Sequence, residues 1–352
     1  MTTINYFANE ARIPLLTGPT PLHKAETLSR ELGIELWLKR DDLTGPSAFG
    51  GNKMRKLEFL LGMAKAKGLE YIFTFGATQS NHAMETAAAC CRCGLKPVLY
   101  LVAVVEPDPK SLRGNMLLDT ILGAEVHVVR MLPGETEEEA DARALEMARR
   151  QIAGLEAQGH GCMEIPIGGS NWIGSMGFAS GYLEMRDQIE SLEIPPFEYI
   201  FHSTGSAGTL AGLMAGRALA AGQEKIVSVG CSPKGPDYED KAAAIANQVL
   251  ERIQEDVRVS REDVTVAREY YGEGYEIPSR ESTAALKLLA RKEGIFLDPV
   301  YTAKAFAGLL DWVKTGKIRP GQRVLFWHTG GSASLFAEPA IVGDFSDEER
   351  KE

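Results

Sequence analysis

The chain has 352 residues and a formal net charge of −10, because 48 Asp and Glu residues outnumber 38 Lys and Arg residues. Hydrophobic residues make up 44% of it and charged residues 24%, which are ordinary values for a globular protein and exclude disordered, collagen-like and membrane-embedded chains. The acidic balance also argues against a protein that binds nucleic acid, although local backbone amides could still hold a small anion such as phosphate.

Apolar runs rich in β-branched and aromatic residues alternate with helical stretches. In chain order, the pattern predicts a strand at residues 36–39, a strand at 71–75 before a helix at 81–93, and a strand at 97–105 before a helix around 111–122. A strand at 125–129 precedes a long helix, a strand at 197–201 precedes a helix from Thr209, and strands follow at 226–230 and 324–327. Such alternation, with nearly continuous apolar strands, predicts an α/β fold with parallel sheets covered on both faces.

Two local features refine this organisation. Thr136 and Glu139 form a capping box that begins the long helix. A change of composition at residues 159–169 indicates a crossover between two lobes.

The sequence also indicates a compartment. Residues 1–6 lack the basic and apolar regions of a signal peptide, and the most apolar run, 98–105, is much shorter than the roughly 20 residues that span a bilayer. Cys90, Cys91 and Cys93 have neither disulfide nor zinc spacing, so we interpret them as buried thiols of a cytoplasmic protein. The six histidines show no metal-ligand spacing, and we expect no metal.

A lysine behind two glycines is the first candidate for chemistry. Lys53 follows Gly50-Gly51-Asn52 at the expected start of a helix, where it could form a Schiff base, contact a phosphate, or simply face solvent. Met54 follows it, which excludes a Walker A loop.

Two polar turns stand between a strand and a helix. Residues 78–82 could bind an anion at a helix N-terminus, or Ser80 and Asn81 could act only as N-caps. Residues 203–209 combine small residues, hydroxyls and glycines, which suits a phosphate cradle better than an ordinary turn. They do not match the GxGxxG pattern, so a dinucleotide site is the weaker interpretation.

Taken together and in order, these motifs resemble the tryptophan-synthase-β-like, fold-type-II pyridoxal-phosphate enzymes, and within them the group of 1-aminocyclopropane-1-carboxylate (ACC) deaminases and D-cysteine desulfhydrases. The resemblance covers nearly the whole chain. It runs through residues 18–22, 38–42, 50–58, 79–82, 113–115, 166–171, 298–309 and 328–336.

The resemblance implies a fold with two open, twisted, mostly parallel sheets and helices on both faces. A large cofactor-binding domain would comprise residues 1–53 and 164–352, a small domain residues 54–163, and the active site would lie in the cleft between them. A homodimer that acts on a small amino acid is also implied, with neither nucleic acid nor membrane as a partner.

The resemblance further implies roles for individual residues. Lys53 matches the lysine that binds pyridoxal 5'-phosphate covalently and then acts as a base at Cα. Ser80, Asn81 and His82 match the turn that receives the substrate carboxylate; Ser80 is also a candidate catalytic residue, and Asn81 matches the residue that contacts the ring hydroxyl of the cofactor. Tyr275 and Tyr301 match two catalytic tyrosines. The phosphate would be held by Thr204, Gly205, Ser206, Ala207, Gly208 and Thr209, and the pyridine nitrogen would face Thr302 or Thr329.

The residue after Tyr301 bears on the substrate. ACC deaminases resemble Asp-Pro-Val-Tyr-Glu there, whereas this chain has Thr302. A carboxylate keeps the pyridine nitrogen protonated, and a neutral hydroxyl does so less firmly, which favours β-elimination of a thiol over opening of a cyclopropane. The best prediction is D-cysteine, converted to pyruvate, ammonia and sulfide.

Several alternatives remain open. The chain could act on ACC, or on another β-substituted amino acid such as cysteate or a chloroalanine. It could carry pyridoxal phosphate without turnover, or be a nucleotide-binding oxidoreductase that uses residues 203–209. At three places the chain differs from the sequence that is usual in this group, and each difference could alter the pocket. Met84 replaces a frequent Arg, Glu276 a usual Gly, and Ser332-Ala333-Ser334 a common Ala-Pro-Ala.

Overall fold

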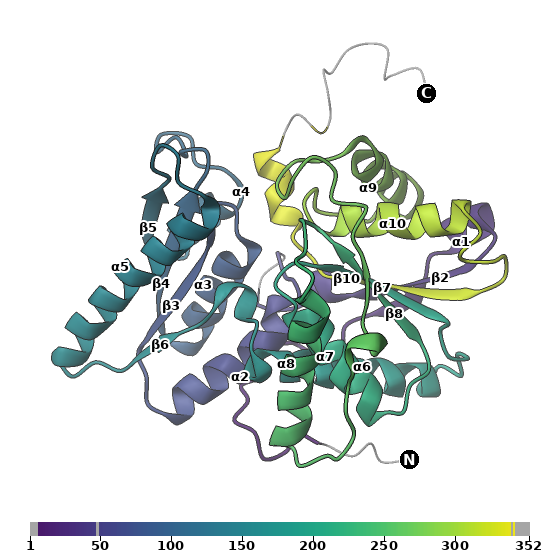
Figure 1. Ribbon diagram of the computed structural model, residues 1–352, viewed down its shortest axis with the longest axis horizontal. Helices are drawn as coiled ribbons and strands as arrows, with labels where there is room; N and C mark the ends of the chain where they lie inside the picture. The colour runs from purple at the N-terminus through teal and green to yellow at the C-terminus, as the bar shows by residue number, and fades with distance from the viewer. Residues whose placement is uncertain (1–5, 47–48, 339–340, 342–352) are drawn as a thin grey trace, which may run out of the picture.

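The computed structural model describes residues 6–46, 49–338 and 341, and these build two sheets with helices around each (Figure 1). The larger sheet has six strands in the order β1-β2-β10-β7-β8-β9, all parallel to their neighbours except β1, which runs antiparallel to β2. Its strands are β1 (Leu22–Lys24), β2 (Glu35–Arg40), β10 (Arg323–His328), β7 (Tyr199–Thr204), β8 (Lys225–Gly230) and β9 (Thr265–Ala267).

The smaller sheet has four parallel strands in the order β5-β4-β3-β6. They are β5 (Glu125–Arg130), β4 (Lys96–Ala103), β3 (Tyr71–Ala77) and β6 (Cys162–Glu164). Alternate residues of β4 pack on opposite faces: Val98 and Tyr100 lie in a cluster with helix α5, whereas Leu99 and Leu101 lie in a cluster with α3 and α4. Burial on both faces explains why this strand is apolar from residue 97 to its end.

Helices cover both faces of the larger sheet as well. In Figure 1, α1, α9 and α10 lie on one face, and α6, α7 and α8 lie on the other, in agreement with the two core clusters that contain them. The helices are α1 (Glu26–Leu32), α2 (Lys53–Ala66), α3 (Asn81–Cys93), α4 (Gly114–Ile121), α5 (Glu137–Ala157), α6 (Trp172–Ser191), α7 (Gly208–Leu219), α8 (Tyr238–Arg252), α9 (Arg280–Glu293) and α10 (Thr302–Lys314). Short 3₁₀ turns are η1 (Asp41–Leu43), η2 (Ile167–Gly169), η3 (Arg261–Asp263) and η4 (Ser332–Ala337).

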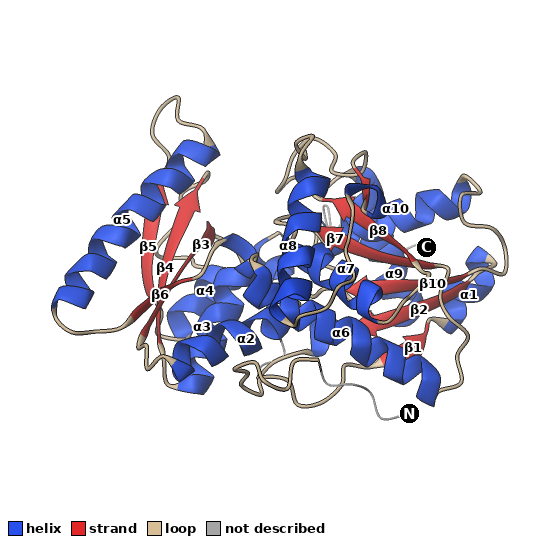
Figure 2. Cartoon of the chain, turned by 60° about the horizontal axis from the view of Figure 1, so that its bottom comes forward, coloured by secondary structure: helices blue, strands red, loops and turns tan. Residues whose placement is uncertain are grey.

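Helix α2 links the two parts of the molecule (Figure 2). Its buried side packs in one continuous apolar cluster with α3 beside the smaller sheet and with α6 and α7 beneath the larger sheet. The position of its first turn therefore depends on both sheets.

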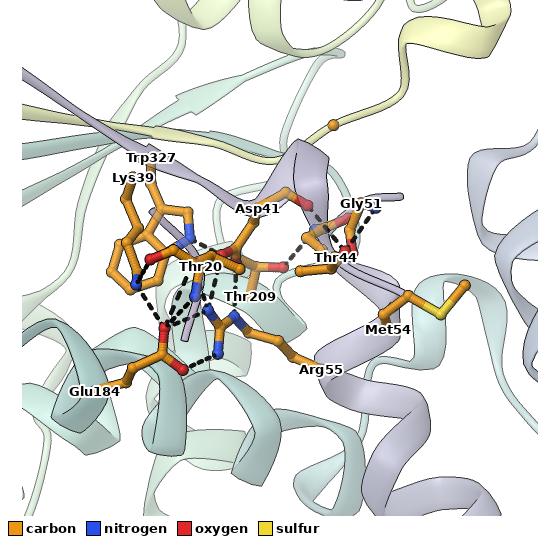
Figure 3. Close-up of polar contacts among 12 residues, drawn as sticks. Thr20, Lys39, Asp41, Thr44, Gly51, Met54, Arg55, Glu184, Thr209 and Trp327 are labelled. Atoms are coloured by element: carbon orange, nitrogen blue, oxygen red, sulfur yellow. Dashed lines mark hydrogen bonds and ion pairs between the residues drawn. The ribbon is translucent and has the colours of Figure 1, made fainter. Parts of the chain in front are cut away.

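A buried ion network anchors that first turn (Figure 3). The Arg55 guanidinium donates to both carboxylate oxygens of Asp41, at 2.7 and 2.8 Å, and to Glu184 at 3.0 Å. Lys39 also pairs with Glu184, and the indole N–H of Trp327 donates to Asp41 at 2.8 Å. Since Arg55 and Asp41 are nearly inaccessible to solvent, removing either charge would leave the other buried without its main partner.

The structure confirms the predicted α/β architecture, the helix at 81–93 and the capping box of Thr136 and Glu139. The strand predicted at 97–105 is wrong at its end, because β4 stops at Ala103 and leaves Val104 and Val105 exposed. The three-residue strands β1, β6 and β9 have no predicted counterpart. Residues 1–5, which fall in the segment without signal-peptide features, lie outside the described residues.

The interpretation of the three neighbouring cysteines as buried thiols holds for Cys90 alone. Cys91 is exposed and Cys93 is intermediate, while Cys90 is buried against the core. Helix α3 is buried at every position from Asn81 to Cys90 and reaches the surface only in its last three residues, which end at the cap Gly94, so Cys91 and Cys93 fall outside the core.

Candidate active site

A cavity of about 340 Å³ lies where the carboxyl ends of the strands in both sheets converge. Its wall contains the first turns of α2, α3 and α5, the loop between β7 and α7, and the segments that follow β8 and β10. Ligands of open α/β sheets bind at this edge because strand ends and helix N-termini present backbone groups there. Twelve predicted site residues line the cavity: Lys53, Ser80, Asn81, His82, Thr204, Gly205, Ser206, Ala207, Thr209, Tyr275, Tyr301 and Thr329.

Lys53 is the first residue of α2 and extends into the cavity. Its Nζ donates to Asn52 Oδ1 at 2.7 Å and lies 6.0 Å from the centre of the Tyr301 ring. Burial lowers the pKa of Lys53, with Glu85 and Asp298 opposing the shift. A larger fraction of this amine is therefore neutral near pH 7 than of an ordinary lysine, which is the form that attacks a carbonyl or removes a proton.

The two glycines before Lys53 allow a close approach of backbone segments. A Cβ on Gly50 would lie 1.8 Å from the carbonyl oxygen of Thr44, and one on Gly51 would lie 2.4 Å from a carboxylate oxygen of Glu85. The Thr44 hydroxyl also bonds to the backbone of Gly51, accepting from its amide at 2.8 Å. No side chain fits at either position.

The loop between β7 and α7 forms a cradle of small residues. Ala207 has a left-handed backbone with φ of 74°, and the 12-residue helix α7 begins immediately after it. Within the described residues no hydrogen bond uses the amides of Gly205 and Ser206, although both residues line the cavity. Free amides at a helix N-terminus are typical of a site for phosphate.

The turn before α3 places three polar side chains in the cavity wall. The Ser80 hydroxyl accepts from the amide of Ala83 at 3.2 Å, so Ser80 is an N-cap as well as a cavity residue. Asn81 Oδ1 accepts from Asn115 at 2.7 Å, while the Nδ2 of Asn81, near Gly331, donates to no other described residue.

His82 is hydrogen-bonded inside the wall of the cavity. Its Nε2 shares a hydrogen bond of 2.8 Å with the Thr74 hydroxyl, which also lies 3.0 Å from the carbonyl oxygen of Ile165. The buried Nδ1 of His82 has no hydrogen-bond partner in the described part of the chain. Burial holds the pKa of His82 well below its ordinary value, so the ring is neutral.

Two tyrosines face each other at the cavity. Their hydroxyls form a hydrogen bond, and the ring centres of Tyr275 and Tyr301 lie 5.6 Å apart. Asp298 accepts from the amide of Tyr301 at 2.8 Å, and Lys304 donates to the carbonyl of Tyr275 at 2.8 Å. Burial raises the pKa of Tyr301, so its phenol retains its proton as a donor.

The structure contradicts a direct role for Thr302. Its hydroxyl donates to Asp298 Oδ1 at 2.6 Å, its amide donates to the same carboxylate at 2.7 Å, and it is fully buried outside the cavity wall. Thr329 does line the cavity, and its hydroxyl bonds to that of Ser203 at 2.9 Å. Gly208 also lies behind the wall rather than in it, with its amide donating to Ser170 at 3.3 Å.

Among the cavity residues that sequence reasoning missed, two contact the predicted site or share its helix. Asn52 joins Lys53 to the cradle, because its Nδ2 donates to Thr209 at 2.9 Å. Lys56 lines the cavity one turn after Lys53, and its Nζ donates to the carbonyl of Gly168 at 2.9 Å. The spacing of three residues between the lysines was the available signal, since such residues share a helix face.

The described part of the chain has neither a metal cluster nor a membrane-spanning helix. No group of three or more His, Cys, Asp or Glu side chains in residues 6–46, 49–338 and 341 is arranged to hold a metal ion. Nor does any helix in that part of the chain have the length and apolar character to cross a bilayer.

Known proteins provide a comparison for this arrangement. The sequence model of a family described as "Pyridoxal-phosphate dependent enzyme" matches residues 13–330. A Thermotoga maritima protein, provisionally named as a 1-aminocyclopropane-1-carboxylate deaminase, is 40% identical over 328 residues, 93% of this chain and 98% of that protein. A D-cysteine desulfhydrase from Klebsiella pneumoniae is 38% identical over 329 residues, 93% of this chain and 95% of the relative. A crystal structure described as an ACC deaminase homologue matches with a TM-score of 0.84 at 32% identity, covering 96% and 97% of the two chains.

Proposed function

Because the chain belongs to the family of pyridoxal-phosphate-dependent enzymes, we propose that it is a lyase that eliminates the β-substituent of a small amino acid, with D-cysteine as the substrate. Overall, D-cysteine and water would give pyruvate, ammonia and hydrogen sulfide. One observation carries the proposal: the amine of Lys53 and the amide-lined cradle at the start of α7 face the same cavity.

The residues of the cavity fit pyridoxal phosphate. The unused amides of Gly205 and Ser206 would hold the phosphate, and the free Nδ2 of Asn81 would donate to the ring hydroxyl. Thr329, which lines the cavity, would face the pyridine nitrogen. Thr302 would not, because its hydroxyl is bound to Asp298 behind the wall. When bound, the cofactor supplies an electron-withdrawing ring that stabilises negative charge at Cα.

The residues of this chain would move the protons. The neutral amine of Lys53, favoured by desolvation inside the cavity, removes the proton from Cα. Tyr301, hydrogen-bonded to Tyr275, donates a proton to the departing sulfur. The Ser80 turn at the start of α3 holds the substrate carboxylate, with His82 beside it in the cavity wall.

The cavity bears on the choice among substrates. Glu137, Asp141 and Glu276 lie in its wall, so a sulfonate-bearing amino acid such as cysteate would meet carboxylates there. The hydroxyl of Thr329 is neutral and would hold a proton on the pyridine nitrogen less firmly than a carboxylate does. The cofactor would then favour a substrate with an easy leaving group, such as a thiol. ACC is the second candidate, because the most similar relative reported above carries that name at 40% identity.

A product assay tests the proposal. Purified protein loaded with pyridoxal phosphate is incubated with D-cysteine, L-cysteine and ACC in parallel, and pyruvate, sulfide and 2-oxobutyrate are measured. We expect pyruvate and sulfide in equal amounts from D-cysteine. 2-Oxobutyrate from ACC alone would contradict the choice of substrate, and no product from any of the three would contradict the lyase.

We also propose an organisation for the whole protein. Residues 1–53 and 164–352 form a large domain around the six-stranded sheet, and residues 54–163 a small domain around the four-stranded sheet, with the cofactor between them. The chain works as a cytoplasmic homodimer. Exposed apolar side chains on α4 and the adjacent η4, among them Ile121 and Phe336, support association, and its unpaired cysteines fit a reducing compartment.

A further inference from the structure

Glu85 is a buried carboxyl group that faces the first turn of α2. It lies on α3, its exposed fraction is 1%, and its Oε2 accepts from the amide of Met54 at 3.0 Å. The other oxygen, Oε1, occupies the space in which Gly51 would otherwise carry a Cβ. The carboxyl group is therefore held between α2 and the glycine turn that precedes it.

Helix α2 has no cap of its own. Asn52 stands at the N-cap position, but its side chain makes no capping hydrogen bond, because it is engaged by Lys53 and Thr209 instead. Glu85, which lies on α3, caps α2 instead by accepting from the amide of Met54. A carboxylate at a helix N-terminus both accepts from free amides and complements the positive end of the helix dipole.

The charges around Glu85 are mainly positive. Lys53 and Lys56 face it from α2, and both lower its pKa, as do the amides of Lys53 and Met54. Burial outweighs them and raises the pKa of Glu85 to about 7. His82 is the histidine on the same helix as Glu85, and it is neutral. Asp298, beyond the cavity, raises the pKa of Lys53, as Glu85 does.

We propose that Glu85 is a positioning residue for Lys53: its carboxylate fixes the first turn of α2, and its charge sets how readily the amine of Lys53 gives up a proton. Coupling of this kind is reciprocal, so the ionised carboxylate holds the proton on Lys53 and its neutral form releases it. This inference rests on the proposed function in one respect, namely that the amine of Lys53 is the group that reacts.

Competitive chemical labelling tests the proposal without cofactor or substrate. Apoprotein is treated with a trace of acetic anhydride across a range of pH, and the label on Lys53 is quantified by peptide mass spectrometry with the exposed Lys65 as internal reference. In E85Q the amide oxygen can still accept from Met54, but the charge is absent. We expect the labelling of Lys53 at pH 7 to rise about 3- to 10-fold, and its midpoint to move to lower pH.

Two comparisons make the result decisive. Asp119 on α4 is another carboxyl group whose pKa burial raises, but it does not act on Lys53. The control variant D119N should therefore leave the labelling curve of Lys53 unchanged. In the wild-type protein the Lys53 curve should have two steps, because Glu85 titrates within its range. An unchanged curve in E85Q, or a single step in the wild type if E85Q does not fold, would overturn the proposal. Since no turnover is measured, this outcome is independent of the product assay.

Discussion

Two lysines line the same cavity, and their surroundings give them different properties. Lys53 is partly exposed, and among the described residues its amine donates to Asn52 alone. Lys56 has an exposed fraction of 1%, and its amine is bound to the carbonyl of Gly168. Lys53 is thus free to react, whereas Lys56 is held behind the cradle as a fixed donor.

At the scale of the residue, the sequence predicts which side chains carry chemistry but not what they contact. Lys53 could be recognised by the glycines before it, and each of those glycines proves to be required by a specific neighbour. Thr302 could not be assigned correctly, because its bond to Asp298 depends on how the start of α10 closes. Glu85 could not be found, since its partner Met54 is 31 residues away.

Replacement of Tyr301 by Phe tests its part in proton transfer. The change removes the hydroxyl and keeps the ring, so Y301F should still bind pyridoxal phosphate while kcat for D-cysteine falls by about 100-fold. Steady-state kinetics and the visible absorbance of the bound cofactor measure the two effects. Unchanged kcat would exclude Tyr301 as the proton donor.

At the scale of the element, local signals fixed some boundaries and tertiary contacts fixed others. Helix α3 begins at Asn81, as predicted, because the Ser80 cap lies within the same segment. The end of β4 was predicted two residues too late, because Val104 and Val105 continue the apolar run but have no neighbouring strand. A three-residue strand such as β6 has too short a pattern to be recognised; pairing with β3 defines it.

The ion network beneath α2 should be important for stability. R55M leaves Asp41 buried and without its guanidinium, so we expect the free energy of unfolding to fall by about 3–5 kcal/mol. K65M, at the exposed end of the same helix, should change it by less than about 0.5 kcal/mol. Urea unfolding of the three proteins gives both values, and a similar small change in both variants would show that the network adds nothing.

The same network predicts how stability responds to acid. Burial alone would raise the pKa of Glu184, but Arg55 and Lys39 outweigh it and hold the pKa at about 2. The carboxylate thus stabilises the fold above about pH 4.5, and this contribution, about 1–3 kcal/mol, is lost as the pH falls toward 2. E184Q should show a shallower loss of stability between pH 5 and pH 3, measured by urea unfolding. An equal slope in both proteins would contradict the assigned pKa.

At the scale of the whole molecule, the cavity is shared by both sheets. The cradle and Thr329 follow strands of the six-stranded sheet, whereas the Ser80 turn follows β3 of the four-stranded sheet. The alternation of strands and helices predicted parallel sheets, and the family resemblance implied that there are two. The sequence could not show that their carboxyl edges meet, because that depends on α2 packing against α3 and α6 together.

Removal of the cofactor should therefore destabilise the protein as a whole. A ligand that binds the folded state alone adds about 2.7 kcal/mol at a free concentration 100 times its Kd. We expect the melting temperature to rise with pyridoxal phosphate concentration, and to rise less in N81A. Thermal scans across a concentration series measure this effect. A melting temperature independent of the cofactor would contradict a site that joins the two sheets.

In the proposed function, Lys53 is the lysine that carries the cofactor. Borohydride reduction of the loaded protein fixes pyridoxal phosphate to the amine that holds it, and peptide mass spectrometry then identifies the modified residue. We expect one modification, on Lys53, which K53A abolishes. Modification of Lys56 instead, or of no residue in the cavity, would contradict this assignment.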